Sequence, residues 1–304
     1  MRFLTAEEAG DLDTVRQIIT ATGIMVRRFE RLPGGCRSVA YVADNLVVRF
    51  PKAEVIWHTM QREKKIIDIV QPYLEEKMPD KVHKIELIDE EYPFSVSKKF
   101  SGKICDNRGE SEHTTGYGAL SAQQQENLAR QVAKFFAAMH SLDYETLEIP
   151  PVEPEIVAAM EGWDVRNRPD FDADKVAAAL LQASDGKINM NDYSAAENEV
   201  VTALCHNDLS GSNMLIEPEA YNVLNGIIDF GNARVVPIVE DFFPLYKINR
   251  KLALDTLKIY NKIVTSPIAQ TQIDGLALRY IGYGLTRGGD MPNPYLMRLL
   301  KMFL

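Results

Sequence analysis

The sequence predicts an α+β fold with two lobes, a small antiparallel sheet carrying one main helix and a larger, mostly helical part. Within the first 100 residues, short β-branched and aromatic runs alternate with turn residues, whereas amphipathic helical patterns dominate afterwards. The chain has 304 residues, enough for both parts to bury a core. We therefore expect an N-terminal lobe over residues 1–100 and a C-terminal lobe over residues 101–304.

Each element of the smaller lobe has a local signal. Thr5–Glu8 has the spacing of a capping box and predicts a helix that runs to about Thr20. The pair Gly34-Gly35 predicts the turn between the first two strands. Strands are expected in five runs, with a helix between the third and the fourth: Ile24–Phe29, Ser38–Val42, Leu46–Phe50, the helix Ala53–Val70, Val82–Ile88 and Phe94–Phe100.

The larger lobe follows a short connector at Lys99–Gly102. Its clearest helix has apolar residues at helical spacing on one face, and two later runs read as a hairpin. The chain from Asp241 onward is expected to be helical, with breaks near Ser266-Pro267 and at Gly282–Pro294. The remaining expectations are the helix Ser121–Leu142, two or three helices within 152–200, and the hairpin strands Met214–Ile216 and Val223–Ile228.

The composition is that of a soluble globular protein, with 46% hydrophobic and 25% charged residues. No apolar run approaches the ~18 residues that a membrane span needs, and the acidic N-terminus does not resemble a signal peptide. Three cysteines lie far apart and form no metal or disulfide pattern. These features predict a cytoplasmic protein.

The negative charge is concentrated in one stretch. The chain carries a net charge of −9, and residues 141–200 alone contain fourteen acidic and four basic residues. Nucleic acid and anionic membrane are excluded as expected partners because both need a basic face. The stretch is either a surface that attracts a cationic ligand or a solvated acidic helix face. No protein partner can be inferred from the sequence.

The first chemical motif is the run from Cys205 to Asn213, with the frame His-x-Asp-x4-Asn. Phosphoryl transfer from a nucleotide needs a carboxylate to accept the hydroxyl proton and ligands that hold metal ions among the phosphates. Asp208 can be that catalytic carboxylate. Asn213 can offer its amide oxygen to Mg²⁺, which prefers oxygen ligands and takes only one or two from protein.

The second motif is Asp229-Phe230-Gly231, which follows an apolar strand. Asp229 would be a second metal ligand at a strand end, and only a short hairpin separates it from Asn213. Each piece alone has an ordinary interpretation: His206 as a core histidine, Asp208 and Asn213 as turn caps, and Asp-Phe-Gly as a common turn. Their correct order and spacing together favour the metal site.

A cation should then hold the α- and β-phosphates, steadied by an acid on the following helix. Arg49 lies within the third expected strand and Glu63 near the middle of the helix, so this pair is preferred. An Arg is chemically suited because its charge is permanent and its fork matches phosphate. Lys52, past Pro51, is the alternative cation, and Arg49 would otherwise be a surface charge of an edge strand.

The loop between the first two strands would cover the phosphates. It reads Pro33-Gly34-Gly35-Cys36-Arg37-Ser38 and matches neither G-x-G-x-x-G nor the Walker motif, so only its position supports the role. Gly34, Gly35 and Ser38 are the candidate phosphate-binding residues.

These residues resemble the aminoglycoside phosphotransferase family, part of the wider protein-kinase-like fold. The matching stretches are Val47–Lys52, Glu63, His206–Asn213 and Ile228–Ala233, with weaker matches at Lys99–Gly102 and Met139–Leu142. The catalytic run and the third strand are most similar to the branch that modifies a 2″-hydroxyl. The resemblance implies Asp208 as base, Asn213 and Asp229 on magnesium, and ATP or GTP bound near Lys98 and Phe100.

A small hydroxyl-bearing acceptor is expected rather than a protein. Gly231 leads within ten residues to Asp241, so the extended activation segment of protein kinases is absent, as is its Ala-Pro-Glu. The acidic stretch would suit a polycationic aminoglycoside. The helix after Asp241 instead begins with Lys247, Arg250 and Lys251. Choline, homoserine, methylthioribose and macrolide sugars therefore remain alternative acceptors, and a catalytically silent binding module remains an alternative class.

Overall fold

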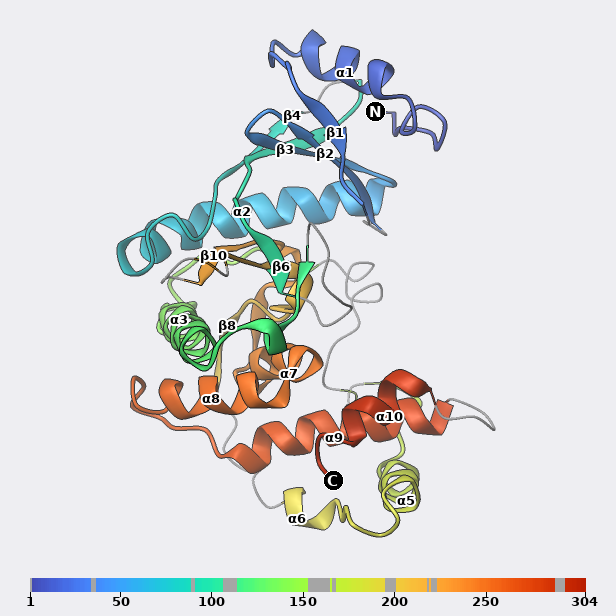
Figure 1. Ribbon diagram of the computed structural model, residues 1–304, viewed down its shortest axis with the longest axis vertical. Coiled ribbons are helices and arrows are strands. Elements are labelled where there is room, and N and C mark those ends of the chain that lie inside the picture. The colour runs from blue at the N-terminus through green and yellow to red at the C-terminus, as the bar shows by residue number, and fades with distance from the viewer. Residues whose placement is uncertain are drawn as a thin grey trace.

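The structure is a computed structural model, shown as a ribbon in Figure 1. It describes residues 2–33, 37–88, 91–105, 114–152, 165, 168–194, 201–217, 219, 223–287 and 293–304. Among these residues, every helix is too short or too polar to cross a membrane.

The N-terminal part is a five-stranded antiparallel sheet with strand order β1-β2-β3-β5-β4. Figure 1 shows α1 above this sheet and α2 running beneath it. Tyr41, Val48 and Phe50 of the sheet pack with Val15 and Ile19 of α1 in one apolar core. The elements are α1 (Leu12–Ala21), β1 (Phe29–Arg31), β2 (Ser38–Ala43), β3 (Leu46–Pro51), α2 (Glu54–Lys77), β4 (Ile85–Ile88) and β5 (Phe94–Lys98).

The rest of the chain is mostly helical and carries short strand pairs. In this part β8 pairs with β11 and β9 pairs with β10, both antiparallel. The elements are β6 (Lys103–Cys105), β7 (Thr114–Thr115), η1 (Tyr117–Ala119), α3 (Ala122–His140), α5 (Ala173–Ala183), α6 (Asn191–Ser194), β8 (Thr202–Cys205), η4 (Gly211–Asn213), β9 (Met214–Ile216), β10 (Leu224–Ile227), η5 (Phe230–Asn232), β11 (Arg234–Pro237), α7 (Val239–Ile248), α8 (Arg250–Tyr260), α9 (Gln270–Arg287) and α10 (Pro294–Leu300).

The predicted fold class is confirmed, but two elements near the N-terminus differ from the expectation. Thr5 and Glu8 do form the reciprocal bonds of a capping box. That turn ends at Gly10, and α1 begins anew after the Asp11 cap. The strand expected at Ile24–Phe29 begins only at Phe29, because the Asp44 carboxylate accepts both the Arg27 and Arg28 amides and bends the chain there.

The main helix is longer than predicted. It was expected to end at Val70 but runs through Pro72 to Lys77. Val70 and Leu74 are buried in the large core that also contains α3 and α7. Packing of the last turns therefore outweighs the hydrogen bond that a helical proline removes.

The break predicted at Gly282 is wrong, because α9 continues through this residue to Arg287. A Cβ at Gly282 would lie 2.8 Å from Val176 of α5. The glycine therefore marks close packing of two helices rather than a turn. A break not predicted occurs at Asn249, which ends α7 and caps α8.

Candidate active site

The loop between β8 and β9 holds the first motif. Asp208 and Asn213 are brought together, since the Asn213 side-chain amide donates to the Asp208 carbonyl at 2.8 Å. The Ser210 amide donates to the same carbonyl at 2.7 Å. The loop closes in the short helix η4, so these backbone bonds set where the Asp208 side chain lies.

The Asp208 carboxylate is partly enclosed and accepts a hydrogen bond from Asn232 at 3.3 Å. Burial and the nearby Asp229 raise the pKa of Asp208 to about 7, although Lys247 and Arg37 oppose the shift. Burial disfavours the charged form and a second carboxylate repels it, so both causes act in the same direction. A carboxylate with such a pKa can accept a proton near neutral pH.

His206 supports this loop from the core rather than acting in the cleft. Its ring is fully buried, and burial lowers its pKa. Nε2 donates to the Ile228 carbonyl at 3.2 Å, and Nδ1 accepts the Asp208 amide at 3.3 Å. One ring nitrogen donates and the other accepts, which identifies the neutral tautomer. His206 thereby ties the Asp208 backbone to the strand that precedes Asp229.

Asp229 lies where β10 ends, with its side chain exposed to the cleft. Its backbone has φ +66° and ψ +66°, a left-handed conformation that is uncommon for a residue other than glycine. The adjacent Ile228 amide donates to the Asn213 carbonyl at 3.1 Å, which joins the two motifs.

The expected metal ligands have suitable chemistry. In the described part of the chain, no donor is recorded for the Asn213 side-chain oxygen, because its amide nitrogen makes the bond to Asp208. The exposed carboxylate of Asp229 likewise faces the cleft. An amide oxygen and a carboxylate are ligands of the type that Mg²⁺ prefers.

Arg49 and Glu63 form an ion pair, with Arg49 Nη2 2.5 Å from Glu63 Oε2. Arg49 also donates to the Ser95 hydroxyl at 3.3 Å. The second oxygen of Glu63 accepts the Phe230 amide at 3.2 Å. Glu63 on α2 therefore connects the sheet cation with the Asp-Phe-Gly run. Lys52, the alternative cation, is exposed beyond the end of β3.

A cleft of about 280 Å³ collects most of the residues expected to bind nucleotide. Arg49, Glu63 and Asp229 line one part, and Lys98 and Phe100 of the connector line another. Gly34 and Gly35 lie outside the described residues. Ser38 begins β2 but is not among the residues that line this cleft, so its predicted role gains no support from its position.

The connector is packed around Phe100. Its ring stacks on His83, with centroids 3.5 Å apart and planes 9° apart. His83 Nδ1 donates to the Lys98 carbonyl at 2.8 Å. On another side, a Cβ at Gly226 would lie 2.4 Å from the Phe100 ring, so only glycine fits at this point of β10. Neither His83 nor Gly226 was singled out from the sequence.

Arg62 is a third buried residue that sequence reasoning missed. It precedes Glu63 on α2 and is 5% exposed. Its guanidinium donates to the carbonyls of Gly231 at 2.9 Å, Ala233 at 2.6 Å and Pro151 at 3.2 Å. Burial and Arg234 lower its pKa to about 10, so it stays charged at neutral pH. An Arg among the apolar positions of an amphipathic helix was the available signal.

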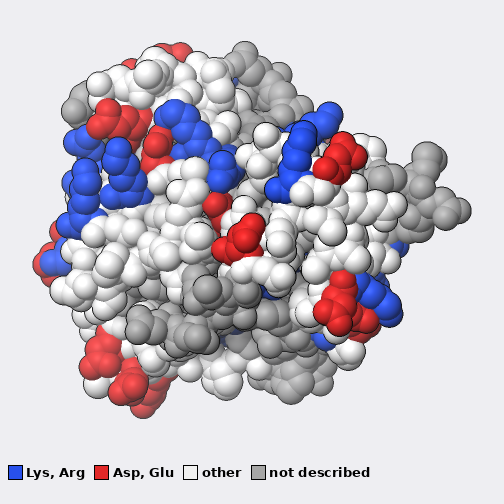
Figure 2. Space-filling model, turned by 90° about the horizontal axis from the view of Figure 1, so that it is seen from below, with Lys and Arg blue, Asp and Glu red and all other residues white. Residues whose placement is uncertain are grey.

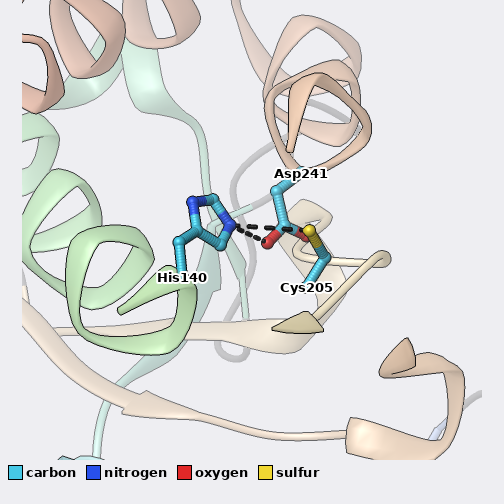
Figure 3. Close-up of side chains that lie close together, drawn as sticks. All are labelled: His140, Cys205 and Asp241. Atoms are coloured by element: carbon cyan, nitrogen blue, oxygen red, sulfur yellow. Dashed lines mark hydrogen bonds and ion pairs between the residues drawn. The ribbon is translucent and has the colours of Figure 1, made fainter. Parts of the chain in front are cut away.

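A buried cluster of His140, Cys205 and Asp241 lies behind the catalytic loop (Figure 3). Asp241 accepts the amides of His206 at 3.1 Å and of Asn207 at 2.5 Å. It also lies 2.9 Å from His140 Nε2, and His140 Nδ1 is 2.9 Å from the Tyr260 hydroxyl. Asp241 thus positions the backbone just before Asp208.

This cluster does not fit a metal site. Both oxygens of Asp241 already accept backbone amides, and both nitrogens of His140 have partners. Burial, followed by the charges of Asp241 and Glu240, raises the pKa of Cys205, which keeps its thiol protonated. A protonated thiol is a poor ligand, so the cluster acts by hydrogen bonding.

Asn207 shapes the loop on its other side. Its φ is +61°, a left-handed conformation that asparagine tolerates. When its amide is oriented to match its neighbours, the oxygen accepts from Arg234 at 2.7 and 2.9 Å and the nitrogen donates to Glu240 at 3.1 Å. Residues of β11 and α7 therefore hold the position before Asp208.

Comparison with known proteins identifies relatives of this architecture. Residues 28–262 match the family described as the phosphotransferase enzyme family. The GDP complex of aminoglycoside 2′-phosphotransferase-IIIa is 17% identical, with a TM-score of 0.67 and 95% of each chain covered. The streptomycin–ATP complex of APH(2″)-IIa is 18% identical, with a TM-score of 0.60 and coverage of 99% of this chain and 96% of that one.

A third solved structure has a different kind of acceptor in its name. The macrolide 2′-phosphotransferase MphH from Brachybacterium faecium is 16% identical to this chain, with a TM-score of 0.62. The match covers 95% of this chain and 98% of that one. At these identities the likeness establishes a shared fold, whereas the match to the family covers more than two thirds of the chain.

Proposed function

Because this chain belongs to the phosphotransferase enzyme family, we propose that it moves the γ-phosphate of ATP or GTP to a hydroxyl of a small molecule. The observation that carries this proposal is the arrangement of Asp208 between two metal-type ligands, Asn213 and Asp229, beside a cleft that contains an Arg–Glu pair. We divide the chain into a nucleotide-clamping lobe over residues 1–100 and a catalytic lobe over residues 101–304.

Each site residue has one role in this scheme. Asp208 orients the acceptor hydroxyl and accepts its proton. Arg49, held by Glu63, contacts the α- and β-phosphates. Lys98 and Phe100 of the connector face the base. Gly34, Gly35 and Ser38 remain the proposed phosphate loop on their place in the sequence alone.

Asn213 and Asp229 would hold Mg²⁺, which neutralises the charge of the phosphates when it is bound. The exposed Asp229 carboxylate and the Asn213 amide oxygen are the groups offered for this purpose. The left-handed backbone at Asp229 directs that carboxylate into the cleft. The chain itself fixes the position of both ligands through the Ile228–Asn213 backbone bond.

The acceptor is a small molecule in this proposal because the chain turns into β11 at Arg234 and into α7 at Val239. This leaves no extended segment on which a peptide could lie. An aminoglycoside is the preferred acceptor, supported by the solved relatives that bind streptomycin and by the net charge of residues 141–200. A macrolide relative of the same fold keeps a macrolide sugar, choline, homoserine or methylthioribose as alternatives.

A coupled assay of nucleotide consumption, with Mg²⁺ and either ATP or GTP, tests the proposal across aminoglycosides, macrolides and small metabolic alcohols. We expect acceptor-dependent turnover with one class, and Asp208→Ala should abolish it while leaving nucleotide affinity within about three-fold. Near wild-type turnover by Asp208→Ala would refute the assignment. Nucleotide binding by calorimetry with no turnover on any acceptor would favour a silent binding module.

A further inference from the structure

A second cleft lies beside the buried His140–Asp241 pair, and its volume is about 600 Å³. It is formed by the end of α3, the start of β8, and the end of α8 with the loop that follows. It shares no lining residue with the nucleotide cleft. This volume falls within the range of sites that bind small organic molecules, roughly 300–1,000 Å³.

The walls of this cleft are mainly apolar. Val201 and Ile263 line it, and they are 47% and 48% exposed, unusual values for large aliphatic side chains. Ala137 and Ala138 of α3 and Val264 continue the same surface. Apolar groups gathered in an exposed hollow commonly mark a binding site, because covering them removes their contact with water.

The charged groups at the cleft are basic. Lys77 and Lys134 line it, and no Asp or Glu is among the lining residues that the structure describes. Lys134 has no ion pair within the described ranges, whereas Lys77 contacts the exposed Glu76 at 2.7 Å. The face in Figure 2 shows basic side chains gathered toward its left edge. The exposed Lys258 and Lys262 of the adjoining α8 region have the same sign.

Where the groove continues, its charge changes. A smaller hollow of about 280 Å³ shares Lys77, Ala138 and Ser141 with the cleft and is lined also by Glu76 and Asp143. An anionic group would be repelled at that end and attracted at the Lys134 end. The hydroxyls of Thr265 and Ser266, on the loop after α8, add hydrogen-bond donors within the cleft.

We propose that this cleft binds a small amphipathic organic anion, namely an alkyl or aryl carboxylate. Its apolar body covers Val201 and Ile263, and its carboxylate lies near Lys134 and Lys77. Apolar area supplies most of the affinity, and the lysines select an acid over a neutral alcohol of the same length.

The site also touches the support of the catalytic loop. His140 and Tyr260 both line the cleft, and they hydrogen-bond to each other. His140 continues to Asp241, which holds the amides of His206 and Asn207. An occupant therefore contacts side chains one step from the Asp208 backbone, while the nucleotide cleft keeps its own separate residues.

Isothermal titration calorimetry with decanoate tests the binding, with 1-decanol and acetate as matched probes lacking the charge or the apolar body. We expect saturable binding of one decanoate, and at least five-fold weaker binding of decanol and of acetate. The double variant Lys77→Ala, Lys134→Ala should weaken decanoate about ten-fold, since each exposed pair contributes up to roughly 1 kcal/mol. Lys175→Ala, on the exposed face of α5, should leave the affinity unchanged.

Filling the cleft provides an independent test. Ala137→Trp, at a half-buried position, and Thr265→Trp, at an exposed one, should each abolish decanoate binding while nucleotide affinity stays the same. The proposal is overturned if both filled variants bind decanoate like the wild type. It is also overturned if Mg²⁺ and ATP displace decanoate, which would place the probe in the nucleotide cleft. These readouts need no phosphoryl transfer, so they stand apart from the proposed reaction.

Discussion

At the scale of single residues, the site combines groups that would be unfavourable elsewhere. Asp208 is a partly buried carboxylate near a second one, and Asp229 has a left-handed backbone. Both features lower the stability of the free protein. They persist because surrounding bonds determine them, including the Asn213 amide on the Asp208 carbonyl and the Phe230 amide on Glu63.

Asp208→Asn should therefore stabilise the metal-free protein at alkaline pH. The native pKa of Asp208 is raised to about 7, so between pH 4 and 7 the native state holds more protons than the unfolded state and the wild type loses stability as pH rises. The variant escapes this loss. We expect a gain in the free energy of unfolding on the order of 2 kcal/mol at pH 8, vanishing near pH 4.

Denaturant unfolding with EDTA present would measure this difference at both pH values. Asp143→Asn, at an exposed position, is the matched control and should change stability by less than about 0.5 kcal/mol. An Asp208→Asn protein less stable than the wild type at pH 8 would contradict the raised pKa.

The choice between Arg49 and Lys52 as phosphate cation can also be decided residue by residue. Arg49 lines the cleft and is held by Glu63, whereas Lys52 is exposed beyond β3. We expect Arg49→Ala to weaken nucleotide binding at least ten-fold and Lys52→Ala less than three-fold, because a desolvated contact contributes more than an exposed one. Calorimetry with Mg²⁺ and each nucleotide measures both, and the reverse order would transfer the role to Lys52.

At the scale of elements, α2 organises the site more than any strand does. Its middle turns carry Arg62 and Glu63 side by side in sequence, both buried. Glu63 bonds to Arg49 and to the Phe230 amide, and Arg62 bonds to carbonyls on either side of Asn232. One helix therefore fixes both the cation in the sheet and the chain that follows Asp229.

Arg62→Met should destabilise the protein and impair the reaction together. The change leaves the carbonyls of Gly231 and Ala233 buried without their charged donor, which costs about 2–4 kcal/mol. Thermal unfolding should show this loss, and turnover should fall at least ten-fold in the folded protein at low temperature. Arg130→Met, on the exposed face of α3, serves as the control. Unchanged stability in Arg62→Met would show that the three bonds contribute nothing net.

At the scale of the whole molecule, the catalytic loop is held from several directions at once. Asp241 of α7 receives two loop amides, His140 of α3 and Tyr260 of α8 continue that contact, and β11 pairs with β8 on the opposite flank. The loop is thus part of the large core that also includes the end of α2. Changes in this core should reach Asp208 without touching nucleotide.

Asp241→Asn tests that dependence. The amide has one acceptor oxygen where the carboxylate has two, so one loop amide loses its partner, at a cost of about 1–3 kcal/mol in stability. We expect turnover to fall at least ten-fold and nucleotide affinity to stay within about three-fold. Asp255→Asn, which removes an exposed pair with Lys251 on α8, should leave both unchanged. A nucleotide affinity that falls together with turnover would indicate general disruption rather than loss of loop support.

The chemical motifs were readable because each is local. His206–Asn213 and Asp229–Gly231 depend on fixed spacing around one turn, and β2, β3, α3 and the β9–β10 hairpin depend on patterns within a single run. The Arg49–Glu63 pair was also found, because the order of a strand and the following helix restricts which cation and which acid can meet. The bounds of α2 and α9 were wrong, because their ends depend on distant packing partners.

The sequence by itself thus determined the order of the catalytic groups and the α+β class. Only the tertiary structure decided how those groups are supported: Arg62 on the chain after Asp229, Asp241 and His140 behind the loop, and His83 against Phe100. The physical reason is that these contacts join residues from about 17 to 170 positions apart. No local spacing encodes such a bond, since it forms only when separate elements pack together and exclude water.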